Sequence, residues 1–487
     1  MSPKRFPDGF LWGTAISAFQ VEMGRGEPSA GSDWYMWVHD EENIASGRVS
    51  GDLPEDGPGF WTLYAEDLRR AREELGNNAV RLSIDWSRIF PMSTQPVEVE
   101  VERDGRGNIA RVDVDEEAMQ RLRELADGSA VRRYRQMLSE ARRLGLTVML
   151  TLYHWPLPLW LHDPIACRDG VEAAARRGWL DQGTVVEFAK YAAFAADALG
   201  DLVDLYATIN EPRIVSEHGY LSERGEFPPG LNDPKLFLAA MKNLSIAHGV
   251  AYEQVKRWDR ASSTGLRTAT VGVVVVLQYY EPDNPADERD VAAARFVEYM
   301  FNEWYLNSAL RGDYDMNLDG VIQPEEQLPH LVKGCDFIGL NYYTRWRVRH
   351  VEGEGDPRFN FVFAPCSGDC SDFGWEIYPQ GLRHVLNWAF KRFRRPIYVT
   401  ENGIADARDV MRECYLVDHL EQLHGAIEDG VPVRGYFHWS LIDNFEWADG
   451  YRMRFGLFKV DMETKERTPT KAAPIYREIA TENRLPE

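Results

Sequence analysis

Residues 395–403 read RPIYVTENG and predict a short buried strand that ends in a carboxylate. Pro396 closes the basic, helix-like segment before it, four strand-forming residues follow, and Asn402-Gly403 is a turn signal. Residues 203–212, VDLYATINEP, repeat this design. A glutamate before a turn is usually a solvated loop residue, so neither segment alone establishes a site. Together, Glu211 and Glu401 suggest two carboxylates that act as a pair.

Apolar, strand-like runs occur eight times, and helical patterns separate them. They lie at about 10–20, 79–86, 146–153, 203–209, 269–277, 335–343, 397–400 and 433–440. Continuous apolar strands that alternate with helices favour a parallel sheet covered on both faces. Eight such units predict an α/β protein with a single (β/α)8 TIM barrel and extended loops, one catalytic domain over residues 1–487. Residues 91–130 are acidic and irregular, with a hairpin turn indicated at Asp104-Gly105, and we expect a surface insertion there.

The composition limits the partners and the compartment. Hydrophobic residues make up 44% and charged residues 27% of the chain, as in ordinary globular proteins. A formal net charge of −22 disfavours nucleic acids and anionic membranes as partners. No apolar segment follows the basic residues near the N-terminus, and no run has the length of a membrane span. We therefore predict a cytoplasmic protein.

The sequence contains five cysteines, Cys167, Cys335, Cys366, Cys370 and Cys414. Their odd number does not favour a disulfide framework, and their spacing does not match that of metal ligands. Cys366 and Cys370 are close enough in sequence to pair. We nevertheless expect a reduced surface loop there.

Polar or aromatic residues stand near the ends of most predicted strands. They are Gln20, Arg81, His154, Asn210, Glu211, Asn341, Tyr343, Glu401, Trp439 and, just beyond the last strand, Glu446. In a parallel barrel the carboxyl ends of the strands surround one mouth, where active sites lie. A ring of such residues therefore predicts a site. Its glutamate pair suits the cleavage of a glycosidic bond, which needs an acid and a base or nucleophile on either side.

Several motifs in the chain resemble those of the family 1 glycoside hydrolases, the retaining β-glucosidase and β-galactosidase group. TINEP at 208–212 and VTENG at 399–403 resemble the paired glutamate motifs of that family. FLWGTA at 10–15, RLSIDWSR at 81–88 and WSLIDNFEW at 439–447 are similar to further family motifs. The resemblance covers the chain from about residue 6 to residue 476.

Three other segments resemble the archaeal β-glycosidase branch in particular. They are the 91–130 insertion, LYHWPLPLW at 152–160 and MRFGL at 453–457. Because that branch is intracellular and commonly tetrameric, the resemblance implies a cytoplasmic homo-oligomer.

The resemblance also implies a role for each site residue. Glu211 would be the acid/base and Glu401 the nucleophile of a double displacement that needs no metal or organic cofactor. Arg81, Tyr343 and Asn341 would support the nucleophile, because donors to a carboxylate favour its ionised form. The substrate-binding residues would be Gln20, His154, Trp155, Asn210, Trp375, Trp439, Glu446 and Trp447.

The expected substrates are terminal β-D-glucosides and β-D-galactosides, as small glycosides or oligosaccharides. The carboxylate of Glu446 at the far end of the sugar would repel a 6-phosphate. Preference for β-mannosides or β-fucosides is an alternative, and so is a non-catalytic sugar-binding relative, although such relatives typically lose one glutamate. For His154 and the tryptophans, ordinary core packing is the structural alternative.

One motif lies outside the predicted mouth. Residues 315–326, DMNLDGVIQPEE, fit the 12-residue calcium loop, with glycine at the sixth position. The ligands would come from Asp315, Asn317, Asp319, Val321 and Glu326. We expect this loop to join a helix ending near 310 to the strand near 335, where a structural Ca²⁺ would stabilise the loop. An acidic surface loop without metal is the alternative.

Overall fold

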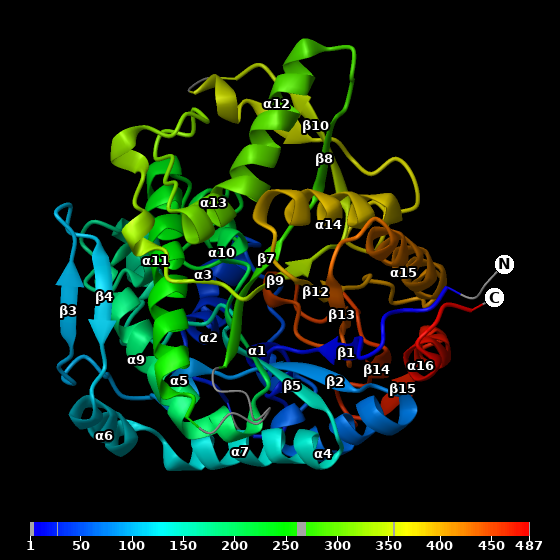
Figure 1. Cartoon of the computed structure of the whole chain (residues 1–487), viewed down its shortest axis with the longest axis horizontal. Coiled ribbons are helices and arrows are strands. Elements are labelled where there is room, and N and C mark those ends of the chain that lie inside the picture. The colour runs from blue at the N-terminus through cyan, green and yellow to red at the C-terminus, as the bar shows by residue number, and fades with distance from the viewer. Residues whose placement is uncertain (1–3, 27, 261–268, 354–355, 487) are drawn as a thin grey trace.

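The computed structural model describes residues 4–26, 28–260, 269–353 and 356–486 of the chain. Eight parallel strands close into a barrel in which β13 pairs with β1, as the sequence predicted (Figure 1). The strands are β1 (Leu11–Ala15), β2 (Ala79–Ser83), β5 (Thr147–Tyr153), β6 (Leu205–Asn210), β7 (Thr270–Val276), β9 (Phe337–Asn341), β12 (Ile397–Asn402) and β13 (Val433–Trp439).

Helices surround the barrel (Figure 1). The longer ones are α4 (Phe60–Arg69), α6 (Glu116–Leu125), α7 (Gly128–Arg143), α9 (Gln182–Leu199), α10 (Pro212–Tyr220), α11 (Pro234–Trp258), α12 (Glu288–Glu298), α13 (Trp304–Arg311), α14 (Pro379–Phe393), α15 (Arg412–Glu428) and α16 (Ala472–Glu482). The shorter ones are α1 (Ala18–Val21), α2 (Asp33–His39), α3 (Glu41–Ala45), α5 (Trp86–Ile89) and α8 (Pro164–Gly170). Aspartates begin several of them, because a carboxylate before the first turn accepts its free N–H groups, as Asp127 does for α7.

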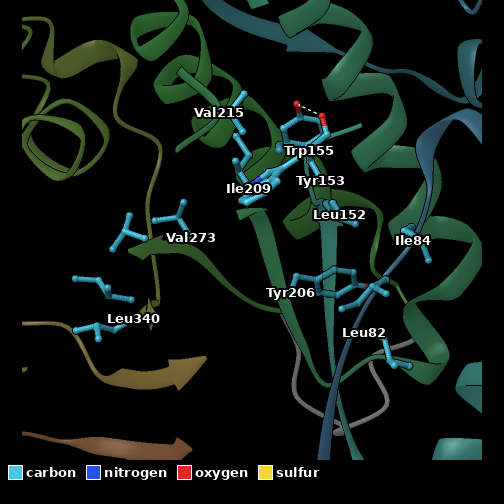
Figure 2. Close-up of a cluster of buried hydrophobic side chains, with 14 of the residues drawn as sticks. Leu82, Ile84, Leu152, Tyr153, Trp155, Tyr206, Ile209, Val215, Val273 and Leu340 are labelled. Carbon is cyan, nitrogen blue, oxygen red and sulfur yellow. Dashed lines mark hydrogen bonds between the residues drawn. The ribbon is translucent and has the colours of Figure 1, made fainter. Parts of the chain in front are cut away.

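The strands separate two apolar layers. Because side chains alternate along a strand, every second residue faces the helices and the others face the lumen. The outer layer includes Leu82, Leu152, Tyr206, Val273 and Leu340 (Figure 2). The lumen holds a second cluster that runs toward the mouth and includes Met149, Leu205, Phe337, Phe437, Tyr343, Trp439 and Phe455. The lumen is therefore packed, and a pocket can form only at its end.

Register shifts interrupt β6 and β12 just before their glutamates. Between β6 and β7, Ala207 pairs with Gly272, but the next pair is Asn210 with Val274. Between β12 and β9, the pair of Val399 and Leu340 is followed by that of Glu401 and Asn341. One extra residue turns everything after it to the other face of the sheet. As a result, Asn210 and Glu401 face the lumen rather than the helices.

The 91–130 segment lies on the surface beside α9 and α11 and contains the hairpin predicted at Asp104-Gly105, although it is more regular than predicted (Figure 1). It contains the hairpin of β3 (Glu100–Arg103) and β4 (Ile109–Asp113), followed by α6. Val97, Val112 and Met119 are buried, and this apolar contact with the barrel helices accounts for its order.

Besides the β3–β4 hairpin, two small sheets of the described chain lie outside the barrel. One consists of β8 (Tyr279–Pro282), β10 (Arg345–His350) and β11 (Phe361–Phe363), in the order β11, β10, β8. The other pairs β14 (Phe458–Val460) with β15 (Arg467–Pro469). The three-stranded sheet contributes to the site described below.

Cys366 and Cys370 form a disulfide, so the prediction of a reduced loop was wrong. The turn between them brings their Cα atoms to 6.2 Å, a separation that a disulfide can bridge. Both lie in the segment that leads from β11 to α14.

Among the described helices, none is long and apolar enough to cross a membrane.

Candidate active site

A pocket of about 340 Å³ lies at the carboxyl ends of the barrel strands. Its lining includes all the predicted substrate-binding residues together with the two glutamates and Tyr343: Gln20, His154, Trp155, Asn210, Glu211, Tyr343, Trp375, Glu401, Trp439, Glu446 and Trp447. Arg81 and Asn341 are buried behind these side chains. Two positions differ from the prediction, since Gln20 lies on α1 after the first strand and Arg81 lies in the middle of β2.

Both carboxyl oxygens of Glu401 accept hydrogen bonds from buried side chains. Arg81 Nη1 donates to Glu401 Oε1 at 2.5 Å, and the Tyr343 hydroxyl donates to Oε2 at 2.6 Å. Arg81 is itself fixed, because its Nη2 donates to Asn210 Oδ1 at 2.7 Å and its Nε to Thr151 Oγ1 at 3.1 Å. A guanidinium and a hydroxyl that donate to both oxygens favour the ionised form and fix its orientation.

Glu211 has different surroundings. It follows β6 and precedes Pro212, the first residue of α10, with a left-handed φ of +48°. Residues other than glycine adopt this conformation at a cost, and such strain is concentrated at functional sites. Burial, and to a smaller extent the negative charge of Glu401, raise the pKa of Glu211 to about 8. Glu211 therefore keeps a proton at neutral pH.

Asn341 does not support the nucleophile, contrary to the prediction. Its Nδ2 donates to Glu211 Oε1 at 2.6 Å, while its Oδ1 accepts from Thr400 Oγ1 at 2.7 Å. Its Nδ2 also lies 3.3 Å from Asn210 Oδ1, which accepts from Arg81. A continuous chain of hydrogen bonds thus joins the two carboxyl groups through Asn341, Asn210 and Arg81.

The inner end of the pocket is polar and aromatic. Burial lowers the pKa of His154, so its neutral Nε2 can accept from Asn210 Nδ2, 3.1 Å away. His154 Nδ1 has no hydrogen-bond partner within the described part of the chain. Trp155 Nε1 donates to the Asn210 carbonyl at 3.0 Å, and its ring lies 4.5 Å from that of Trp447. Such an enclosed end suits a hydroxylated ring.

Glu446 closes this inner end. Gln20 Nε2 donates to Glu446 Oε2 at 3.3 Å. Burial raises the pKa of Glu446 well above its usual range, and the carboxylates of Asp449, Glu401 and Glu211 add to that effect. Amide and carboxyl groups in this position can bind hydroxyls as donors and acceptors.

The remaining lining of the pocket was largely missed from the sequence. It is lined by Arg213, Ile214, Glu217, His218, Arg224, Glu226, Phe227, Val276, Gln278, Trp346, Phe363, Phe373, Ala448, Asp449 and Phe455. The residues of α10 follow Glu211 within seven positions, and that proximity could have predicted them. Trp346 and Phe363 belong to the three-stranded sheet, and no motif marks them.

The 315–326 loop joins α13 to β9, as predicted, and lies outside the pocket. Asp315 Oδ2 accepts the Gly320 N–H at 2.7 Å, and the two oxygens of Glu326 accept backbone N–H groups of Met316 and Gln323 at 3.0 Å. Within the ranges that the structure describes, no group of three or more His, Cys, Asp or Glu side chains is placed to hold a metal ion.

The sequence model of glycosyl hydrolase family 1 matches residues 2–103 and 126–485. The chain belongs to glycosyl hydrolase family 1. Residues 104–125, which the model does not match, fall within the surface insertion at 91–130. The predicted family and barrel are therefore confirmed.

Individual relatives cover nearly the whole chain. A β-galactosidase of Pyrococcus woesei is 40% identical over 98% of this chain and 97% of its own length. A β-galactosidase of Sulfolobus acidocaldarius is 41% identical over 99% and 96%. The crystal structure of the β-glycosidase of Thermosphaera aggregans superimposes with a TM-score of 0.90 at 40% identity, covering 99% of this chain and 98% of that one. A β-glucosidase mutant described as derived from a tetrameric structure has a TM-score of 0.86 at 42% identity, covering 99% and 97%.

Proposed function

We propose that this glycosyl hydrolase is a retaining exo-β-glycosidase that removes terminal β-D-glucosyl and β-D-galactosyl units by double displacement. The observation that carries this proposal is the unlike state of its two carboxyl groups. Burial and a neighbouring charge keep the proton on Glu211, whereas Arg81 and Tyr343 hold Glu401 ionised. The names of the relatives, β-galactosidase and β-glycosidase, support the sugar class.

In the first step, a Glu401 oxygen attacks the anomeric carbon while Glu211 donates its proton to the glycosidic oxygen. The bond to the leaving group breaks, an ester bond to Glu401 forms, and the aglycone departs as an alcohol. Arg81 and Tyr343 orient the nucleophile, which removes the entropy cost of finding the attack geometry.

In the second step, water hydrolyses the ester between the sugar and Glu401. Because the ester carries no charge, Glu211 loses the neighbouring negative charge that raised its proton affinity, and it can accept a proton from water. The water oxygen attacks the anomeric carbon, Glu401 leaves as a carboxylate, and Glu211 is protonated again. Two inversions at the same carbon retain its configuration.

The inner end of the pocket explains why a terminal sugar would be the unit removed. Gln20, His154 and Glu446 close that end and offer donors and acceptors for hydroxyls. Asn210, whose side-chain oxygen accepts from Arg81, would bind the 2-hydroxyl beside the anomeric carbon.

The test is hydrolysis of the nitrophenyl β-glucoside, β-galactoside, β-fucoside and β-mannoside by wild type and by Glu401→Gly, with and without formate. We expect wild-type turnover that collapses in the variant and returns with formate, which fills the place of the carboxylate. The anomeric form of the first product, followed by NMR, tests retention. No turnover of any of the four would favour a sugar-binding role.

We further propose a cytoplasmic homo-oligomer, a tetramer. Support comes from the described tetrameric origin of a solved β-glucosidase that is 42% identical. Light scattering after size exclusion would measure the mass in solution, and a monomer of 55.8 kDa would contradict the proposal.

Calcium binding by residues 315–326 stays a prediction. In its favour, Gly320 has the positive φ, +76°, that the sixth position of such a loop requires. Calorimetry in calcium and in EDTA tests it, and equal melting temperatures would contradict it.

A further inference from the structure

Tyr415 lies in the first turn of α15, outside the lining of the pocket, and its side chain is buried. Its hydroxyl donates to the backbone carbonyl of Tyr343 at 3.1 Å. The same hydroxyl accepts a hydrogen bond from Asn402 Nδ2 at 3.0 Å. One hydroxyl group therefore joins the backbone of Tyr343 to the side chain of Asn402.

Both partners of this hydroxyl are attached to the nucleophile. Asn402 follows Glu401 directly in β12, and the Tyr343 hydroxyl donates to Glu401 Oε2 at 2.6 Å. Hydrogen bonds lead from Asn402 through Tyr415 to the Tyr343 carbonyl, and the Tyr343 hydroxyl closes the ring at the carboxylate. A closed ring of covalent and hydrogen bonds restricts the movement of each member. The Tyr415 hydroxyl thus fixes the backbone of the donor relative to the backbone of the nucleophile.

Tyr343 depends on such an attachment because it lies between two strands. It follows β9 and precedes β10, so its backbone belongs to neither strand. A hydrogen bond weakens steeply when its angle departs from the optimum, so the donor to Glu401 must be held in one orientation. Asn402 Nδ2 also donates to the carbonyl of Tyr342, at 2.7 Å. The segment that carries the donor is therefore attached to the strand that carries the nucleophile.

The surroundings of Tyr415 suit a hydroxyl that donates and a ring that stays in place. Burial raises the pKa of Tyr415 above its usual range, so the hydroxyl keeps the proton that it donates. The ring stacks on that of His419, with centroids 3.8 Å apart and an interplanar angle of 25°. His419 Nδ1 in turn lies 2.7 Å from the Tyr415 carbonyl oxygen. Because packing holds the ring, loss of the hydroxyl alone should leave α15 where it is.

We propose that Tyr415 is a positioning residue for the hydrolysis, whose hydroxyl holds the Tyr343 donor against Glu401 while the carboxylate attacks the sugar. The inference rests on the proposed function, which makes Glu401 the nucleophile. It adds a residue that contacts neither the substrate nor the carboxylate and still affects the rate.

A double-mutant cycle tests this role. We would measure kcat/KM on nitrophenyl β-glucoside and β-galactoside for wild type, Tyr415→Phe, Tyr343→Phe and the double variant. Tyr415→Phe should lose about two- to ten-fold, the size of one hydrogen bond between neutral groups. In the Tyr343→Phe background the same change should cost almost nothing, because no hydroxyl remains to be positioned. Equal losses in both backgrounds would overturn the inference, since they would reflect damage to the fold.

Tyr476→Phe is the matched control. Tyr476 is also buried, and its hydroxyl also donates to a backbone carbonyl, that of Gly13, at 2.6 Å. Its loss should lower the melting temperature about as much as Tyr415→Phe does and leave kcat/KM at the wild-type value. Equal losses of activity in the two variants, or an unchanged activity in Tyr415→Phe, would overturn the inference.

A second variant serves if Tyr415→Phe does not fold. The Tyr436 hydroxyl donates to Asn402 Oδ1 at 3.0 Å, on the opposite side of Asn402 from Tyr415 in this network. Tyr436→Phe should therefore lower kcat/KM less than Tyr415→Phe is expected to, and the loss should vanish in the Tyr343→Phe background. A loss that persisted there would overturn the inference.

Carbon-13 NMR of tyrosines labelled at Cζ separates this inference from the proposed function. The Tyr343 resonance, assigned with Tyr343→Phe, reports the hydrogen bond of its hydroxyl. It should move in Tyr415→Phe, which keeps the aromatic ring, and stay in place in Tyr476→Phe. A wild type without activity would contradict the proposed function, yet this pattern would still support the positioning. An unmoved resonance would exclude the positioning even in an active enzyme.

Discussion

The ends of β6 and β12 look alike in sequence but differ in their surroundings. Each consists of an apolar strand, a register shift, a glutamate and a residue that stops the strand. Across the barrel, Glu401 meets a guanidinium and a hydroxyl, whereas Glu211 meets the neutral amide of Asn341. Neighbouring strands, rather than the local sequence, therefore determine which carboxyl is charged and which is protonated.

The largest loss of activity should come from removal of the Glu401 side chain. We expect Glu401→Gly to lower kcat by on the order of 10⁴-fold or more, because no ester can form. Added formate should restore turnover of nitrophenyl glycosides. The matched variant Glu211→Gly should not respond to formate in the same way, since its nucleophile is intact. Equal rescue of both would show that the two ends are equivalent.

The loss of activity on removing the protonated glutamate, Glu211, should depend on the leaving group of the substrate. We expect Glu211→Gln to lose about 10²- to 10⁴-fold in kcat/KM on disaccharides, the usual contribution of a general acid. Dinitrophenyl glycosides, whose leaving group needs no proton, should lose far less. The ratio of the two losses is the measurement, and a ratio near one would remove Glu211 from the role of acid.

Smaller effects should distinguish the partners of each carboxyl. Tyr343→Phe removes a donor to Glu401 and should lower kcat/KM about 10- to 100-fold, the cost of a hydrogen bond to a charged group. Asn341→Ala removes a donor that lowers the pKa of Glu211, so the basic limb of the pH profile should move upward. Profiles from pH 4 to 10 measure both. A basic limb that moved in Tyr343→Phe but not in Asn341→Ala would reverse the assignment.

The smallest effect should be on the melting temperature of the Glu211→Gln variant. The pKa of Glu211 rises from 4.5 to about 8 on folding, so its contribution is fully present below 4.5 and is lost as pH rises through 8. Glu211→Gln stays neutral and escapes this loss. Its melting temperature should match wild type near pH 4.5 and exceed it by a few degrees at pH 8.5. A difference that stayed constant between these pH values would argue against a buried, raised carboxyl.

Local patterns predicted much of this molecule. Apolar periodicity identified the eight barrel strands and the helices between them, because each strand is buried on both faces. The motifs around Glu211 and Glu401 lie next to turn signals, so both carboxyls could be placed at strand ends without a structure. The sequence did not reveal the register shifts that turn Asn210 and Glu401 inward, since these depend on pairing with β7 and β9.

Contacts between distant segments account for the rest. Asn341 was assigned to the wrong carboxyl, because only the closed barrel shows that it reaches Glu211. Trp346 and Phe363 reach the pocket through a sheet formed by loops of different strands, which no periodicity predicts. The Cys366–Cys370 disulfide was missed because a spacing of four residues fits a reduced loop equally well.

Glu211 holds its proton because it is buried beside the negative charge of Glu401. The most direct measurement is a carbon-13 NMR titration of labelled glutamate carboxyls in wild type and in Glu401→Gln, with Glu211→Gln to assign the resonance. Glu211 should titrate near 8 in wild type. In Glu401→Gln its pKa should fall but remain above 4.5, because the burial is unchanged. Titration near 4.5 in wild type, or the same value in both proteins, would contradict the account.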